Sequence, residues 1–376
     1  MPIGRIKSID IFRGLCMGWM VLIHLIDWWI IPQDRWVFWA VVSIFSPIGA
    51  SGFVFISGVS VSIYHSKRMH KSKNSDDYNH KIARNEYFFR AFFILIVALI
   101  YNLFIAIGIS NPTMIWAWFI LQTIGFSLLM AWPLLKTSKI FRLLFGAALW
   151  AINQYLFFIL SPNQNQLSIE GVLFHLLFNP VDQDHIFSFF TFFLVGTVIG
   201  DVIHDIYLID NSSVKKAFIR KKLLFPSVLA GVPLIVIGFY FLHSILFTER
   251  ALTMKIVIWW KIYVLGILLI FISILLYLEV SNTFQTKKNY KYLHYFSYYS
   301  LTFYLAHNGL YFLFLYQLNA INIWIFIFIT YVILGFLMRF LYKKWGPNLS
   351  LKVQIGRLSS RLAKKMHYKK SINMDE

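Results

Sequence analysis

The chain has 376 residues, of which 59% are hydrophobic and only 14% are charged. A soluble domain does not bury that much apolar surface, so the composition excludes an ordinary soluble protein. The formal net charge of +19 would suggest nucleic-acid binding in a soluble protein. In a membrane protein, basic segments on one side of the bilayer explain it, and we expect no nucleic-acid partner.

Apolar runs of about 20 residues, each long enough to cross a hydrocarbon core of roughly 30 Å, repeat along the sequence. They predict an all-α fold, a polytopic membrane helix bundle with about ten transmembrane helices. The expected spans are residues 9–31, 45–65, 87–109, 113–135, 140–160, 186–204, 223–247, 255–278, 295–317 and 321–342. The single cysteine, Cys16, excludes an intramolecular disulfide, and no Cys or His pattern predicts a metal site.

The first span carries four ionisable residues: Asp10, Arg13, His24 and Asp27. Because an α-helix turns by about 100° per residue, all four fall within one arc of about 100°. Such groups cost about 2.5 to 3.5 kcal/mol each on insertion scales and persist where they face a bundle interior or a watery cavity. This stripe predicts a functional site. The alternative is that its members pair only to hold the bundle together.

Arg13 and His24 are eleven residues apart, about 16 Å along a helix axis, on nearly the same face. Arginine stays charged and binds phosphate with a planar fork, whereas histidine accepts a proton near neutral pH or acts as a nucleophile. The spacing suits a substrate with an anionic part at the cytoplasmic mouth and a reactive part deep in the membrane. Asp27, one turn beyond His24, is placed to orient the imidazole. We group Asp10 with Arg13 at the cofactor-binding end.

Later segments are less specific. Small residues in FISGVSVSIY at 55–64 predict close helix packing, and residues 66–86 are expected to form a mobile basic linker. The connection at 161–185 has an apolar core, LSIEGVLFHLLF, which is too short to span and would lie along the outer interface or re-enter the bundle.

The basic residues predict the orientation. With the N-terminus inside, the cytoplasmic segments hold 30 of the 35 Lys and Arg residues, four lie on the other side, and Arg13 lies within the first span. By the positive-inside rule, both termini are expected to be cytoplasmic. We expect residues 1–345 to form the transmembrane domain and residues 346–376 a basic cytoplasmic tail on the anionic leaflet.

The run IDIFRGLCMGWMVLIHLID, followed by FVFISGVSVSIYHSKR, resembles the opening of the heparan-alpha-glucosaminide N-acetyltransferase catalytic domain family. An arginine followed eleven positions later by a histidine is also the signature of the wider group of membrane acyltransferases that includes the O-antigen acetylases. Weaker likenesses follow at 118–130, 182–202 and 296–311, so the resemblance covers about residues 5–316.

The resemblance implies a transmembrane acetyltransferase. Its acetyl group would come from cytoplasmic acetyl-CoA and pass to an amino sugar or sugar hydroxyl, free or on a glycolipid, on the extracytoplasmic side. His24 matches the family's essential histidine and Arg13 the arginine before it. His24 would act as a general base or as a transient acetyl carrier, and both paths stay open. His307 would line the same cavity, while Asp184 and His185 are candidates for binding the acceptor.

Two other classes of protein remain. A multi-span transporter or flippase of a small polar or lipid-linked substrate would also carry ionisable residues at mid-membrane, although inverted repeats and broken helices are not evident in the sequence. A non-catalytic scaffold would use the stripe for packing alone. Because nothing marks a lysosomal protein, we expect a multi-pass protein of the plasma membrane of a prokaryote, with a homodimer left open.

Overall fold

The computed structural model describes residues 5–75, 78–281 and 291–372. This part of the chain is built of helices and has no β-strand; its one β-type pairing is an isolated bridge between Ile30 and Leu318. The prediction of an all-α fold is confirmed. The chain divides into two compact units, which we describe separately. Unit 1 takes its described residues from Ser57–Leu208 and Val353–Glu376, and unit 2 from Gly4–Ile56 and Ile209–Lys352.

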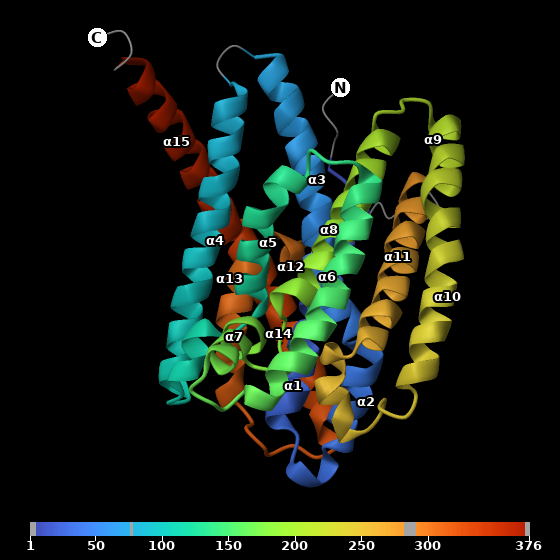
Figure 1. The fold of residues 1–376 in the computed structure, drawn as a ribbon, viewed down its shortest axis with the longest axis vertical. Helices are drawn as coiled ribbons and strands as arrows, with labels where there is room; N and C mark the ends of the chain where they lie inside the picture. The colour runs from blue at the N-terminus through green and yellow to red at the C-terminus, as the bar shows by residue number, and fades with distance from the viewer. Residues whose placement is uncertain (1–4, 76–77, 282–290, 373–376) are drawn as a thin grey trace. The chain divides into compact units, whose positions relative to one another are not determined.

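Unit 2 contains the helix with the polar stripe. In this unit α1 packs against α11 and α12, and α10 lies beside α11 (Figure 1). The close α10–α11 contact depends on glycine, because a Cβ on Gly266 would lie 2.6 Å from the carbonyl oxygen of Gly231. Its helices are α1 (Lys7–Trp29), α2 (Trp36–Phe45), the start of α3 (Gly52–Lys73), α9 (Ser212–Ile219), α10 (Phe225–Leu242), α11 (Ile258–Val280), α12 (Lys291–Tyr298), α13 (Ser300–Ala306) and α14 (Asn322–Lys344).

Unit 1 is organised around α8, which packs against α6 and α5. A Cβ on Gly58 of α3 would overlap the carbonyl oxygen of Phe193 in α8, so the small residues of α3 do form a close packing face, as predicted. The helices of this unit are most of α3, α4 (His80–Gly108), α5 (Ile120–Leu134), α6 (Lys139–Leu160), α7 (Ile169–Phe178), α8 (Ile186–Tyr207) and most of α15 (Leu351–Ile372).

Short turns of 3-10 or π type join these helices. They are η1 (Pro32–Asp34), η2 (Pro47–Ser51), η3 (Pro112–Trp116), η4 (Ser161–Asn163), η5 (Arg220–Leu224), η6 (Glu249–Ile256), η7 (His307–Phe312) and η8 (Gly346–Asn348). In the expected connection at 161–185, the apolar core forms the short helix α7.

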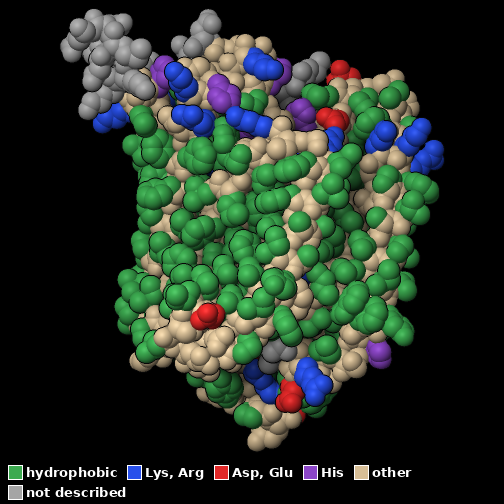
Figure 2. All heavy atoms as spheres, in the orientation of Figure 1, with side chains coloured by type: hydrophobic (Ala, Val, Ile, Leu, Met, Phe, Trp, Pro, Cys, Tyr) green, Lys and Arg blue, Asp and Glu red, His purple; other side chains and the backbone are tan. Residues whose placement is uncertain are grey.

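Nine stretches of the described chain are long and apolar enough to cross a membrane. The chain is therefore an integral, multi-pass membrane protein, and each of the nine overlaps one of the ten expected spans. The remaining expected span, 295–317, is broken into the end of α12, α13 and η7. Asn308 and Gly309, a dipeptide that favours turns, lie where α13 is replaced by η7. Figure 2 shows hydrophobic side chains over the middle of the helices and Lys and Arg side chains toward helix ends.

The segment at 66–86, expected to be a mobile linker, is largely ordered into helices, because α3 continues to Lys73 and α4 begins at His80. The Glu86 carboxylate, which is 2% exposed as a residue, holds the two helices together. It accepts hydrogen bonds from Tyr64 (2.7 Å), Arg68 (2.6 Å) and Tyr78 (2.7 Å).

The basic segment after Lys344 also forms a helix, α15, over Leu351–Ile372. Its fully buried Ala363 packs within unit 1 against Tyr78, Ile82 and Ala83. Its association with a lipid leaflet stays a prediction.

Replacing Glu86 by Ala should lower the free energy of unfolding by about 3 to 5 kcal/mol, because it leaves Arg68 and two tyrosine hydroxyls without their buried acceptor. Thermal unfolding in detergent measures the effect. Glu170→Ala, at an exposed position of α7, is the matched control. Equal unfolding temperatures for both variants would contradict this account of the helix pair.

Candidate active site

The start of α1 is fixed to α11 by one carboxylate. Glu279 accepts hydrogen bonds from the backbone N–H groups of Lys7 (2.9 Å) and Ser8 (2.7 Å) and from the Ser8 hydroxyl. The Ser8 hydroxyl oxygen also lies 2.9 Å from the carbonyl oxygen of Leu275, a second acceptor for its single proton. A carboxylate on the free N–H groups of a helix start satisfies donors that have no partner within the helix, and it complements the helix dipole.

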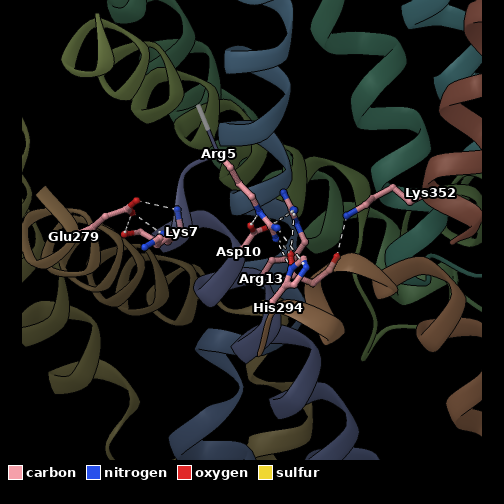
Figure 3. Close-up of polar contacts among 9 residues, drawn as sticks. Arg5, Lys7, Asp10, Arg13, Glu279, His294 and Lys352 are labelled. Atoms are coloured by element: carbon pink, nitrogen blue, oxygen red, sulfur yellow. Dashed lines mark hydrogen bonds and ion pairs between the residues drawn. The ribbon is translucent and has the colours of Figure 1, made fainter. Parts of the chain in front are cut away.

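Beside this anchor, six residues from separate parts of unit 2 form what we call the charged cluster: Arg5, Asp10, Arg13, His294, Ser297 and Lys352 (Figure 3). Asp10 lies at its centre. It forms an ion pair with Arg5 and accepts a hydrogen bond from the Ser297 hydroxyl at 2.9 Å. Arg13 lies 3.9 Å from Asp10 and donates to Ser297 at 3.4 Å.

The charged cluster is net positive, because it brings three permanent cations around one carboxylate. Lys352 completes it by donating to the Ser297 carbonyl at 2.8 Å, and the Arg5 guanidinium contacts both ring nitrogens of His294. Burial lowers the pKa of His294, as do Arg5 and Lys352, while Asp10 acts in the opposite direction. His294 is therefore neutral at pH 7 and adds no charge to the cluster.

Farther along the same face of α1 lies a pair of imidazoles. The ring centroids of His24 and His307 are 5.2 Å apart. The Trp28 indole stacks against both rings, with centroid distances of 5.1 Å to His24 and 5.7 Å to His307. The Tyr311 ring also belongs to this group, and its centroid lies 5.5 Å from that of Trp28. The break in the expected span at 295–317 thus places a histidine of η7 against the histidine of α1.

His307 is held in one orientation. It is 2% exposed, and its Nδ1 is within hydrogen-bond distance of the Tyr304 carbonyl oxygen. A carbonyl oxygen only accepts, so Nδ1 carries the proton and Nε2 keeps its lone pair. Among the described residues, Nε2 of His307 has no hydrogen-bond partner. A buried imidazole with a free lone pair is equipped to accept a proton from a bound substrate.

At the other end of α1, Asp27 pairs with Arg35, whose guanidinium lies 2.6 Å from the carboxylate and also donates to the Asp27 carbonyl at 2.8 Å. The structure therefore places Asp10, Arg13, His24 and His307 along α1 and pairs Asp27 with Arg35, the residue between η1 and α2. An orienting role of Asp27 toward His24 stays a prediction.

Asp184 and His185 belong to unit 1. Both are buried, at 4% and 1% exposed, and both support the connection before α8. The Asp184 backbone bonds to Trp118 (2.9 Å) and accepts from the Thr123 hydroxyl, and His185 Nε2 lies 2.9 Å from the Pro180 carbonyl. Their role in binding an acceptor remains a prediction.

Sequence reasoning missed four members of the charged cluster: Arg5, His294, Ser297 and Lys352. Arg5 and Lys352 counted only as basic residues of cytoplasmic segments, and nothing in their spacing connects them across more than 300 residues. Ser297 lies within one of the weaker likenesses, at 296–311, which was the available signal. Among the residues that the structure describes, no group of three or more His, Cys, Asp or Glu side chains is placed to hold a metal ion.

Fold and site together define a multi-span helical membrane protein in which one helix connects a net positive cluster to a buried imidazole pair. The sequence model for heparan-alpha-glucosaminide N-acetyltransferase, catalytic, matches residues 5–245, and the chain belongs to this family of membrane acetyltransferases. The match includes Arg13 and His24, whereas His294 and His307 lie beyond it. No curated protein and no solved structure matches the chain.

The lowered pKa of His294 predicts a pH dependence of stability. Below about pH 6.5 the unfolded chain binds a proton at this histidine that the folded state resists, so the folded state loses stability as the pH falls. The unfolding temperature of the wild-type protein should therefore fall between pH 7.5 and pH 5. The unfolding temperature of the His294→Gln variant should fall less. An equal drop in both proteins would contradict a neutral, buried His294.

Proposed function

We propose that this membrane acetyltransferase takes the acetyl group of acetyl-CoA from the cytoplasm and passes it to an amino sugar or sugar hydroxyl on the extracytoplasmic side. The observation that carries the proposal is the line along α1, where the charged cluster and the His24–His307 pair share one face. Family membership supports the acetyl transfer. The distribution of Lys and Arg supports the cytoplasmic position of the cluster.

The charged cluster suits the phosphates of coenzyme A. Arg13 presents a planar donor set to oxyanions, and Arg5 and Lys352 add to the positive potential. Asp10 would position these cations, because it already binds Arg5 and receives the Ser297 hydroxyl. The cluster suits the phosphates because of its charge, since basic side chains outnumber carboxylates at this end of α1.

The imidazole pair suits the acyl transfer. About 16 Å of helix axis separates Arg13 from His24, so an extended donor held at its phosphates would present its thioester near His24. The stacked Trp28 and the buried His307 would keep bulk water from the thioester. We therefore place His307 in the reaction centre, in addition to the cavity-lining role expected from the sequence.

Both chemical paths break the thioester C–S bond and form a C–N or C–O bond to the acceptor. In direct transfer, an imidazole takes the proton of the attacking amine or hydroxyl, and coenzyme A leaves as the thiol after receiving a proton. In the two-step path, one ring nitrogen of His24 attacks the thioester, coenzyme A leaves as the thiol with the proton of the other ring nitrogen, and the acceptor then attacks the acetyl-imidazole and releases His24. In direct transfer His24 would take the acceptor's proton, and in the two-step path the unpartnered Nε2 of His307 would receive it and return it to the leaving His24 imidazole.

The acceptor would reach this pair from the extracytoplasmic side. Asp184 and His185 remain candidates for binding it, as does Asp27 for orienting His24. We place the protein in the plasma membrane of a prokaryote, where a glucosamine-containing glycan or glycolipid would be the acceptor.

Replacing His24 by Ala should lower acetyl transfer by about 10²- to 10⁴-fold, the usual loss on removing a general base, while the protein stays folded. Release of CoA thiol from acetyl-CoA, with glucosamine as acceptor in proteoliposomes, measures the rate. His243→Ala, at an exposed position after α10, is the control. Substantial turnover by a folded His24→Ala protein would refute the assignment.

Replacing Arg13 by Ala should raise KM for acetyl-CoA by about tenfold or more, because hydrogen bonds to a charged group contribute about 1.5 to 3 kcal/mol. KM for the acceptor should change much less. Lys7→Ala, at an exposed cation beside the cluster, is the control. An unchanged affinity for acetyl-CoA would remove the phosphate role of Arg13.

A transporter or flippase is the other class considered. Coupled substrate uptake by proteoliposomes in the absence of acetyl-CoA, together with no release of CoA thiol, would favour it over acetyl transfer.

A further inference from the structure

One buried cation of unit 2 is used by neither the charged cluster nor the imidazole pair. Lys261 of α11 is 0% exposed, and its Nζ has no hydrogen-bond partner among the residues that the structure describes. A buried charge without a partner is strongly unfavourable. An oxyanion brought by a bound ligand would compensate this charge, which the described residues do not.

The acidic residues of unit 2 are engaged elsewhere or lie at the surface. Asp10 and Asp27 form ion pairs with Arg5 and Arg35. Glu279 binds the start of α1, and Asp34 accepts from the backbone N–H of Ala320 at 2.7 Å. Asp210 and Glu249 are exposed.

The antiparallel register of α1 and α11 gives the depth of Lys261. The Ser8 hydroxyl oxygen lies 2.9 Å from the Leu275 carbonyl oxygen, and the rings of Phe12 and Phe271 lie 5.3 Å apart. One turn further, Cys16 and Leu268 both border the Cβ position of Gly52, at 2.9 and 3.4 Å. Continuing the same spacing by two turns brings Lys261 level with Ile23 and His24.

A second cation of the same region acts on His24 directly. Lys255, in the turn η6 that leads into α11, lies close enough to the His24 imidazole to interact with it electrostatically. The end of α11 beside the imidazole pair is therefore positive. This is the side from which the proposed acceptor would arrive.

We propose that Lys261 binds an acidic group of the acceptor, a carboxylate or a phosphate, and so selects anionic amino sugars over neutral ones. The proposal rests on the proposed acetyl transfer and names the class of acceptor. The lysine supplies the positive charge in a region of low dielectric constant, where its attraction to an oxyanion is strong.

The test compares three acceptors with purified protein in proteoliposomes: glucosamine, glucosamine 6-phosphate and muramic acid, an amino sugar that carries a carboxylate. We expect KM to be at least about tenfold lower for one of the two anionic sugars, as for a hydrogen bond between charged groups. Which of the two is preferred distinguishes phosphate from carboxylate. In Lys261→Met, and in Lys261→Gln as a second variant, this preference should disappear, whereas Lys222→Met, at an exposed lysine of η5, should keep it.

Thermal unfolding provides a readout that does not need turnover. Lys261→Met should raise the unfolding temperature by a few degrees, roughly, because an apolar side chain replaces an unpaired buried charge. The preferred anionic sugar should raise the unfolding temperature of the wild-type protein but not that of this variant. If no sugar is acetylated, the proposed transfer fails. The rise in unfolding temperature with either anionic sugar, in the wild-type protein but not in Lys261→Met, then still tests whether Lys261 binds an acidic group.

Three results would overturn the proposal: equal KM values for neutral and anionic sugars in the wild-type protein, an unchanged preference in both Lys261 variants, or a lower unfolding temperature of Lys261→Met. The last would mean that the lysine is satisfied by the protein itself.

Discussion

The structure of unit 2 depends on how a helix within a membrane carries charge. An ionisable side chain at bilayer depth is tolerated where other groups solvate it, and α1 meets this demand in a different way at each level. Glu279 satisfies its first N–H groups, the charged cluster surrounds Asp10 and Arg13, and Arg35 neutralises Asp27. His24, between them, has another imidazole as its neighbour.

This arrangement separates binding from chemistry along one helix. The permanent cations gather at the end of α1 that the distribution of basic residues predicts to be cytoplasmic, whereas the two imidazoles lie about three turns farther along the helix. A donor with charged phosphates at one end and a reactive thioester at the other matches that separation. The interrupted segment from α12 to η7 contributes to both groups. Ser297 of α12 belongs to the charged cluster, and His307 of η7 belongs to the imidazole pair.

Much of this could be predicted from the sequence because the membrane imposes simple rules. Apolar length gave the helices, and the 3.6-residue period placed Asp10, Arg13 and His24 on one face. Their partners confirm the shared face, since all three contact residues between 294 and 307. The family followed from the motif around Arg13 and His24.

The rest depends on contacts between residues far apart in the chain. Ser297 meets Asp10 because α12 packs against α1, and Lys352 meets Ser297; no periodicity of a single helix reports such contacts. The broken span at 295–317 was hidden because its mean composition is apolar enough to cross a membrane. In the sequence, Lys261 is only one of the four Lys and Arg residues assigned to the extracytoplasmic side. That its Nζ has no hydrogen-bond partner among the described residues is visible only in the structure.

The most direct test of the central claim is the sidedness of the transfer. Proteoliposomes would be loaded with glucosamine inside, supplied with radiolabelled acetyl-CoA outside, and assayed for acetylated sugar in the lumen and CoA thiol in the medium. The yield would be expressed per protein molecule whose basic loops face the medium, where the acetyl-CoA is. Labelled sugar inside with thiol outside, in equal amounts, is the result that the account predicts. No labelled sugar in the lumen, with acetylation only when glucosamine is added to the side that received acetyl-CoA, would contradict it.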